Sequence, residues 1–264
     1  MPSTVMVFSH PNHEIAALGT IDRIRPHVVF LTDGGGEDRV SQTRDGLSSY
    51  LQPEMLHFLN HSEVSLYGAL LSHAADFCLS IAMELRDILR RLRPQVIYCD
   101  AVEFYNPVHD LTLPIVRAAL GKCDDIPVFE VPLIHQKVSD GAFEMQRVPP
   151  SLESDCIWFD LNDAELQRKR EVLTGDRYKA LFSQMGHLIL SAIPSRAQRE
   201  QFLRARSSLP RPAPEQVLRY EERGHMLKSN GVVRDVIGYH EHYVPMFTSL
   251  CSFEDLSWAE RVEN

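Results

Sequence analysis

The sequence predicts an α/β protein with a Rossmann-like, three-layer fold and a mostly parallel sheet. Three short apolar runs, at residues 4–8, 27–31 and 95–99, have the composition of strands that are buried on both faces. A turn rich in Gly, Asp, Asn or Pro follows each of them. A segment with helical periodicity precedes the third run, and alternation of strands with helices is typical of a parallel sheet covered by helices.

The first helix with a clear pattern is expected at residues 74–92. Its apolar residues recur at helical spacing, and the segment ends just before Pro94, which cannot continue a helix. Two further apolar stretches, at residues 128–134 and 157–161, are expected to continue the sheet.

The last elements are marked by capping and turn residues. Asn162 is a suitable N-cap for a helix over residues 163–173, because its side-chain oxygen can accept from a free amide of the first turn. The Pro-rich residues 209–214 predict a surface loop. We expect one domain over residues 1–264, since no segment has the composition of an interdomain linker, with residues from about 185 to 264 covering the pocket.

Composition limits the classes of function. Hydrophobic residues make up 44% of the chain and charged residues 24%, which is enough to bury a core. The formal net charge of -9 argues against nucleic acid as a partner, because phosphate contacts need a basic patch. No secretory signal or membrane-length apolar run is found, so we expect a cytoplasmic protein without a membrane partner. A small-molecule substrate is the expected partner, and a homo-oligomer is left open.

Three histidines follow the ends of predicted strands. His10 and His13 come directly after the first strand, and His109 follows the third. Parallel strands present their carboxyl ends at one edge of the sheet, so the three imidazoles can converge. Three imidazoles with a fourth position left open are a layout for catalytic zinc, and imidazole also suits iron. The sequence therefore predicts a divalent metal site, most simply zinc with iron as the alternative.

Several motifs resemble those of the LmbE/PIG-L family of zinc-dependent deacetylases. The run His10-Pro11-Asn12-His13-Glu14 resembles the family's His-Pro-Asp-Asp-Glu signature, which also follows a first strand. Thr32-Asp33-Gly34-Gly35 looks like its Thr-Asp-Gly turn, and Asn106-Pro107-Val108-His109 stands where the family has His-Pro-Asp-His. Ser183-Gln184 resembles a Ser-Gln element, so the likeness covers residues 4–184, about two thirds of the chain.

The resemblance implies roles for particular residues. His10, His13 and His109 match the three metal-ligand positions, although the middle ligand is an aspartate in the family. Arg44 falls where a family arginine often binds substrate, and Asp33 belongs to the turn on the substrate side. The implied activity is metal-dependent hydrolysis of an amide or related C–N bond in a small polar, sugar-like or natural-product molecule.

The chain departs from the family at the positions that handle protons. Asn12 stands where the family has its general base, and an amide cannot take a proton from water at neutral pH. Asn106 replaces a histidine that stabilises charge, and Val108 replaces the acidic residue that orients it. Phe104 lies where many relatives place a tyrosine hydroxyl. We keep Phe104 and Asn106 as candidate substrate contacts.

Two interpretations of these departures remain open. A neutral imidazole in place of a carboxylate ligand leaves the ion more positive, which lowers the pKa of water bound to it and makes a strong base less necessary. Glu14, Glu103 or Asp110 would then carry the proton, with Asn12 beside them in the site. Alternatively, hydrolysis is lost, and the chain is an iron- and oxygen-dependent three-histidine enzyme or an inactive ligand-binding homologue.

Overall fold

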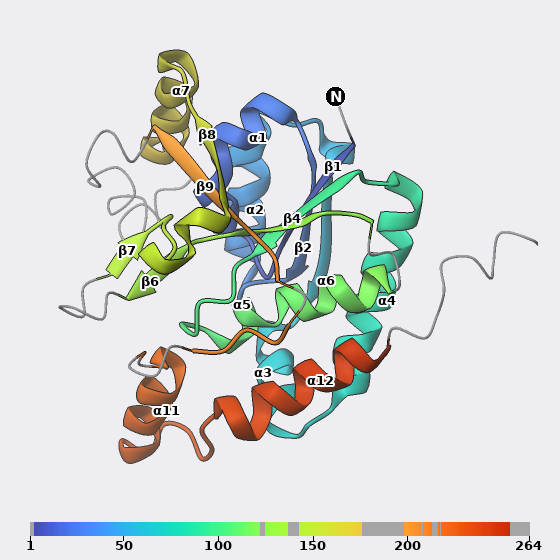
Figure 1. Cartoon of the computed structure of the whole chain (residues 1–264), viewed down its shortest axis with the longest axis vertical. Helices are drawn as coiled ribbons and strands as arrows, with labels where there is room; N and C mark the ends of the chain where they lie inside the picture. The colour runs from blue at the N-terminus through green and yellow to red at the C-terminus, as the bar shows by residue number, and fades with distance from the viewer. Residues whose placement is uncertain are drawn as a thin grey trace, which may run out of the picture.

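The computed structural model describes residues 3–121, 125–136, 143–175, 198–206, 208–212, 216 and 218–253. Its main sheet has seven strands in the order β3-β2-β1-β4-β5-β9-β8. Strands β3, β2, β1, β4 and β5 pair with their neighbours in parallel, and β9 pairs antiparallel with both β5 and β8. The predicted Rossmann-like α/β fold with a mostly parallel sheet is therefore confirmed (Figure 1). The strands are β1 (Thr4–Phe8), β2 (His27–Thr32), β3 (Leu56–His61), β4 (Val96–Asp100), β5 (Val128–Val131), β8 (Cys156–Asp160) and β9 (Arg199–Arg204), and a second sheet pairs β6 (Ile134–Gln136) with β7 (Phe143–Met145).

Helices cover both faces of the main sheet (Figure 1). The α-helices are α1 (Leu18–Ile24), α2 (Glu37–Leu47), α3 (Glu63–Leu71), α4 (Ala75–Leu92), α5 (Pro107–Asp110), α6 (Thr112–Leu120), α7 (Asp163–Thr174), α11 (Arg219–Ser229) and α12 (Val244–Ser252). Short 3₁₀ turns form η1 (His13–Ala17), η2 (Pro53–Met55) and η3 (Pro150–Asp155), and a single π-helical turn forms η6 (Tyr239–Tyr243).

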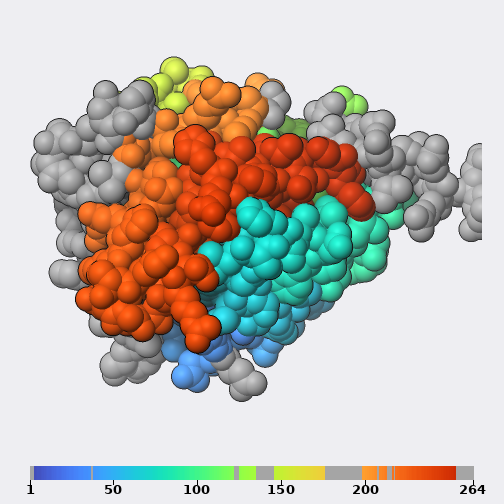
Figure 2. All heavy atoms as spheres, turned by 90° about the horizontal axis from the view of Figure 1, so that it is seen from below, coloured from blue at the N-terminus to red at the C-terminus, as the bar shows by residue number. Residues whose placement is uncertain are grey.

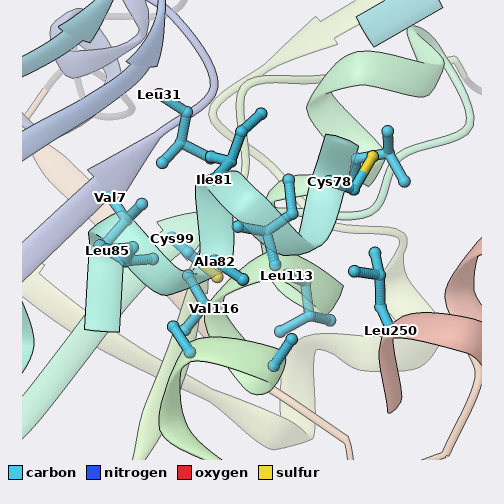
Figure 3. Close-up of a cluster of buried hydrophobic side chains, with 14 of the residues drawn as sticks. Val7, Leu31, Cys78, Ile81, Ala82, Leu85, Cys99, Leu113, Val116 and Leu250 are labelled. Carbon is cyan, nitrogen blue, oxygen red and sulfur yellow. The ribbon is translucent and has the colours of Figure 1, made fainter. Parts of the chain in front are cut away.

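Alternation along β1 divides the core into two layers of side chains. Val5 and Val7 point to the cluster formed with α4, α6 and α12, whereas Met6 and Phe8 point to the cluster formed with α1 and α7. All four side chains are fully buried, as expected for a central parallel strand. Figure 3 shows the first cluster, in which Val7 meets α4 and α6 side chains. The three-layer arrangement follows from this alternation.

Most predicted elements are confirmed, with small shifts at their ends. The helix expected at 74–92 is α4, and the helix expected at 163–173 is α7. Asn162 caps α7 as predicted, because its side chain accepts from the Glu165 amide while the Glu165 carboxylate accepts from the Asn162 amide. Residues 209–212 have no regular secondary structure, in agreement with a loop, and residues 213–214 lie outside the described residues.

Two expectations about strands need correction. The apolar stretch 128–134 is not one strand, because β5 ends at Val131 and β6 begins a separate two-stranded sheet. The interval between the second and third predicted strands contains an additional strand, β3, at the edge of the main sheet. Five of its six side chains are half-buried and Asn60 is exposed, and the strand includes His57 and His61, so it lacks the apolar signal of a central strand.

The C-terminal elements pack on the same core as the first strand. Tyr243, Phe247 and Leu250 of η6 and α12 belong to the buried cluster that contains Val7. In the part of the chain that the structure describes, no helix combines the length and apolar character that crossing a bilayer requires.

A buried carboxyl in β5 makes stability depend on pH. Burial raises the pKa of Glu130 from its ordinary 4.5 to about 7, although its carboxylate accepts from the Val102 amide at 2.9 Å. Because the folded-state pKa is the higher one, Glu130 favours the folded state fully below pH 4.5. We expect this contribution, about 3 kcal/mol, to be lost as pH rises through 7.

Urea unfolding at a series of pH values checks this expectation. Glu130→Gln keeps a hydrogen-bond acceptor but cannot ionise, so the difference in unfolding free energy between variant and parent should grow between pH 4.5 and 7.5. Glu54→Gln, at an exposed position, is the control and should leave the pH profile unchanged. A Glu130→Gln profile parallel to that of the parent would contradict the assignment.

Candidate metal centre

Strand order brings the three predicted ligands to one place. His10 and His13 follow the carboxyl end of β1, and His109 lies in α5 after β4. These two strands are adjacent and parallel, with Val7 of β1 opposite Cys99 of β4, so both chains leave the sheet at the same edge. All three imidazoles are buried there, and one nitrogen of each lies within 4.8 Å of the others.

The spacing of the rings suits a single tetrahedral ion. The Nε2 atoms of His10 and His109 are 3.1 Å apart, and the His13 ring centroid lies 3.9 Å from that of His10 and 4.1 Å from that of His109. Two nitrogens bound tetrahedrally at the usual zinc distances would be separated by about 3.3 Å. The residues present therefore fit a divalent metal.

The outer nitrogens of two rings are already bonded to the protein. His10 Nδ1 lies 2.9 Å from the Pro11 carbonyl oxygen, and His13 Nδ1 lies 2.9 Å from Asp100 Oδ2. With Nδ1–H donating to these oxygens, each Nε2 keeps its lone pair for a metal. Among the described residues, His109 Nδ1 has no hydrogen-bond partner.

The surroundings keep the imidazoles neutral. Burial lowers the pKa of His10, and it lowers the pKa of His13 and His109 well below the usual value. The positive charge of Arg39 acts in the same direction on all three rings. Neutral imidazole is the form that binds a metal, so no proton competes for the cluster at neutral pH.

Asp100 is a member of the site that the sequence analysis did not single out. It is the last residue of β4, and its Oδ2 accepts from the Ser9 amide at 2.6 Å and from His13 Nδ1. A carboxylate behind a ligating histidine fixes the ring and raises its basicity. The family that the motifs resemble has a carboxylate as its middle ligand. In this chain the carboxylate of Asp100 lies behind the middle histidine and accepts a hydrogen bond from it.

Removing the Asp100 charge should weaken the metal centre. We expect Asp100→Asn to lower metal affinity by about 10- to 100-fold, because the His13 ring would lose its anionic acceptor. Competition with a chromogenic chelator measures the change. Glu130→Gln, which alters a buried carboxyl on the neighbouring strand β5, should leave the affinity unchanged. Equal affinities for parent and Asp100→Asn would exclude the assigned role.

Thr43 of α2 holds the two polar residues on either side of His13. Its hydroxyl accepts from the Asn12 amide at 3.0 Å and lies 2.7 Å from Glu14 Oε1 and 3.1 Å from Asn12 Oδ1. Asn12 has φ 84°, a left-handed conformation that asparagine tolerates better than most residues. Glu14 is fully buried beside it. A threonine in the following helix gave no signal in the sequence.

The loop after β4 is held by two buried carboxyls. Asp110 accepts from the amides of Glu103 at 2.9 Å and Phe104 at 3.2 Å, and Glu103 accepts from Leu133 and Ile134, each at 2.8 Å. Phe104 has φ 58°, a strained conformation for an aromatic residue. Burial raises the pKa of Asp110 to about 8. Both carboxyls therefore fix the path of the backbone toward His109.

Asn106 begins the helix that carries the third ligand. Its Oδ1 accepts from the Val108 amide at 2.9 Å, which makes it the N-cap of α5. The same atom accepts from the Tyr67 hydroxyl of α3 at 3.0 Å. Asn106 thus positions His109 and links it to α3.

The two substrate-side residues expected from the resemblance occupy different surroundings. Asp33 Oδ1 accepts from the amides of Gly35 at 2.9 Å and Glu63 at 3.1 Å, which shapes the turn. Arg44 is exposed, and its guanidinium lies 5.0 Å from the centre of the Phe58 ring.

Arg39 is the arginine that lies beside the histidines. A Cβ built on Gly34 would be 3.1 Å from both Arg39 Cδ and His10 Cβ, so the two side chains flank this glycine. Gly34 has φ 65°, and no other residue fits its conformation and crowding without strain. The position of Arg39 in the first turn of a helix that follows a strand end was the only available signal.

Other candidates stay outside the cluster. Ser183 and Gln184 lie outside the described residues. His242 is buried, but its Nδ1 accepts from the Gly238 amide at 3.0 Å and its ring stacks on His73 at 5.2 Å, while His240 is exposed. Among described residues, His10, His13 and His109 form the only group with metal-ligand geometry.

Comparison with solved structures agrees with the fold. A conserved protein of Thermus thermophilus, TT1542, has a TM-score of 0.53 at 17% identity, covering 80% of this chain and 98% of its own. A deacetylase of the teicoplanin biosynthesis pathway gives 0.51 at 13% identity, covering 78% and 100%. The A40926 pseudoaglycone deacetylase Dbv21 gives 0.52 at 12%, covering 79% and 99%.

No family model and no curated protein matches the sequence. At these identities the likeness concerns the fold, and it extends over nearly the full length of each neighbour. The resemblance expected from the motifs is therefore confirmed at the level of structure: the chain has the fold of the LmbE-like deacetylases.

Proposed function

We propose that this protein is a divergent LmbE/PIG-L-type hydrolase that cleaves an amide or related C–N bond in a small polar, sugar-like or natural-product molecule with the help of a divalent metal, most simply zinc. We further propose that residues 1–264 form one domain. The observation that carries the proposal is the buried cluster of His10, His13 and His109 at the carboxyl edge of the sheet. The deacetylase fold of the neighbours supports it.

The residues of the chain divide the work as follows. A divalent ion held by the three imidazoles would supply Lewis-acid polarisation of the acyl oxygen and lower the pKa of water. Asp100 keeps the His13 ring in the ligating tautomer, and Asn106 sets the start of the helix that presents His109. Arg39 flanks Gly34 opposite His10, and its charge acts on all three rings, so it would provide a positive charge for a substrate oxygen.

Proton transfer falls to a residue other than Asn12, whose amide has no basic atom. Of the two carboxyls that we propose, Glu14 shares the Thr43 hydroxyl with Asn12 and so lies next to the position of the family base. Asp110 is held by two backbone amides and is the second choice. Phe104, Asn106, Asp33 and Arg44 are the proposed substrate-side residues.

The test is a measurement of acyl release. The full chain, loaded in turn with Zn, Fe, Mn, Co and Ni, is incubated with a panel of N-acetylated amines and sugars, and free acetate is measured. We expect release with at least one metal and none after chelation. Absence of acetate with every metal would contradict the hydrolase.

A second candidate is a ligand-binding homologue without turnover. The amide of Asn12, engaged with Thr43 where a base is needed, is the observation that favours it. Metal binding without acetate release, together with ligand binding measured by calorimetry, would identify this case. Bound iron with oxygen consumption would instead indicate oxidative chemistry.

A further inference from the structure

A cavity of about 1150 Å³ lies beside α5, the helix that carries His109, between α11 and α3. It is larger than most small-molecule sites, which measure about 300–1,000 Å³. Residues on its wall include Tyr67, Asn106, Arg223, Leu227, Arg234 and Val236. Asn106 lies on this wall and also caps the helix that carries His109, so the cavity and the histidine cluster share this helix.

The outer wall is a helix with almost no core of its own. In α11 only Tyr220 is buried, and Met226 is 53% exposed. Backbone and side-chain contacts fasten the helix near its start: the Arg219 amide donates to the Phe104 carbonyl at 3.0 Å, and Glu221 Oε1 accepts from the Tyr239 amide at 2.6 Å. Figure 2 shows α11 and the segment after it lying beside α3.

The apolar side chains of this wall therefore face the cavity instead of a protein core. Met226, Leu227 and Val236 line it together with Tyr105 from the loop before α5. The apolar side chains of such a helix become buried when an apolar ligand fills the cavity.

Positive charge accompanies the apolar wall. Arg219, Arg223 and Arg234 line the cavity against two acidic residues, Glu222 and Asp235, although the chain as a whole carries a net charge of -9. Arg219 is paired with Glu222, whereas Arg223 and Arg234 form no ion pair within the described part of the chain. The positive charge of Arg223 acts on the pKa of the Tyr67 hydroxyl, and that hydroxyl donates a hydrogen bond to Asn106. A positive charge therefore lies toward the end of the cavity near α5.

We propose that this cavity holds the substrate of the metal centre, and that the substrate is a small amide that carries a carboxylate and an apolar arm. The carboxylate meets Arg223 and Arg234, the arm lies against Leu227 and Val236, and the amide reaches past Asn106 toward the histidines. The proposal rests on the proposed hydrolase and names its substrate class.

Binding is tested on the metal-free full chain, so that turnover does not interfere. Isothermal titration uses N-octanoyl-L-glutamate, with N-octanoylethanolamine lacking the carboxylate and N-acetyl-L-glutamate lacking the arm. We expect the first to bind at least about tenfold more tightly than either of the others, since each lacks one of the two contacts. Equal affinity for all three, or no binding, would overturn the proposal.

Variants separate the two contacts. Arg223→Gln/Arg234→Gln should weaken N-octanoyl-L-glutamate about tenfold and leave N-octanoylethanolamine unchanged, whereas Leu227→Asp should weaken both. Arg170→Gln, on exposed α7 surface, is the control. Circular dichroism verifies that each variant is folded. If the double arginine variant binds like the parent, the charge assignment is wrong.

Two further outcomes are distinguishable from failure of the hydrolase. The titration uses the metal-free chain, and the cavity lining does not include the three histidines, so it reports on the cavity independently of the metal site. Binding without acyl release in the metal panel would therefore contradict the proposed hydrolase activity and leave the cavity as a ligand-binding site. A dimer in light scattering that Leu227→Asp dissociates, with no binding of the probe, would show that a second copy of the chain occupies the cavity.

Discussion

Replacement of His109 by alanine is expected to abolish metal binding. Metal analysis after dialysis should fall from about one ion per chain to near zero, since two imidazoles do not complete a stable tetrahedral site. His109 Nε2 lies 3.1 Å from His10 Nε2, so the loss removes one of the three nitrogens that converge on the candidate ion position. Acyl release, where the parent shows it, should fall to background.

The matched control is His225→Ala. His225 is an exposed histidine of α11 and does not belong to the cluster. Its variant should keep the full metal content and the thermal stabilisation that metal gives the parent. If His109→Ala retained its ion while His225→Ala lost it, the centre would have to be sought elsewhere in the chain.

The convergence of the three histidines was predictable because it depends on topology. Adjacent parallel strands end at one edge of the sheet, and His10, His13 and His109 follow two such ends. This inference needs only the order of strands and the positions of the histidines in the sequence. The observed order β3-β2-β1-β4-β5 is that of a doubly wound sheet, and it places β1 beside β4.

The partners of these histidines were not predictable in the same way. Asp100 could be seen only as the residue that ends a strand, and Thr43 and Arg39 lie in a helix whose register against the first loop is set by packing. The role that the resemblance implies for Arg44, and the proton-carrying role expected of Asp110, depend on side-chain directions. Side-chain directions come from tertiary packing, which periodicity does not encode.

Strand β9 was missed for a reason that differs from that for the edge strand β3. Strand β9 begins with Arg199 and Glu200 and reads as polar, yet residues 200–203 are buried. It is stable there because its charges find partners inside the fold, above all Glu200. A hydrophobicity pattern cannot reveal a buried strand whose burial depends on ion pairing.

That ion pair should be the costliest single contact to break. Lys169 Nζ of α7 lies 2.7 Å from Glu200 Oε1, and both side chains are completely inaccessible to solvent. Glu200 also accepts from the amides of Gly19 at 2.9 Å and Thr20 at 2.7 Å, so one carboxylate joins α1, α7 and β9. We expect Lys169→Met to lower the unfolding free energy by about 3–5 kcal/mol, because an uncompensated charge stays buried.

Urea denaturation with a double-mutant cycle tests the origin of this cost. Lys169→Met/Glu200→Gln removes both charges and should recover much of the stability, since desolvation of the carboxylate, and not loss of attraction, dominates the penalty. Arg206→Gln breaks the exposed pair with Asp155 and should cost less than about 1 kcal/mol. If the double variant were less stable than Lys169→Met alone, the hydrogen bonds that the α1 amides donate to the Glu200 carboxylate would outweigh the cost of its buried charge, and β9 would be held mainly by those contacts.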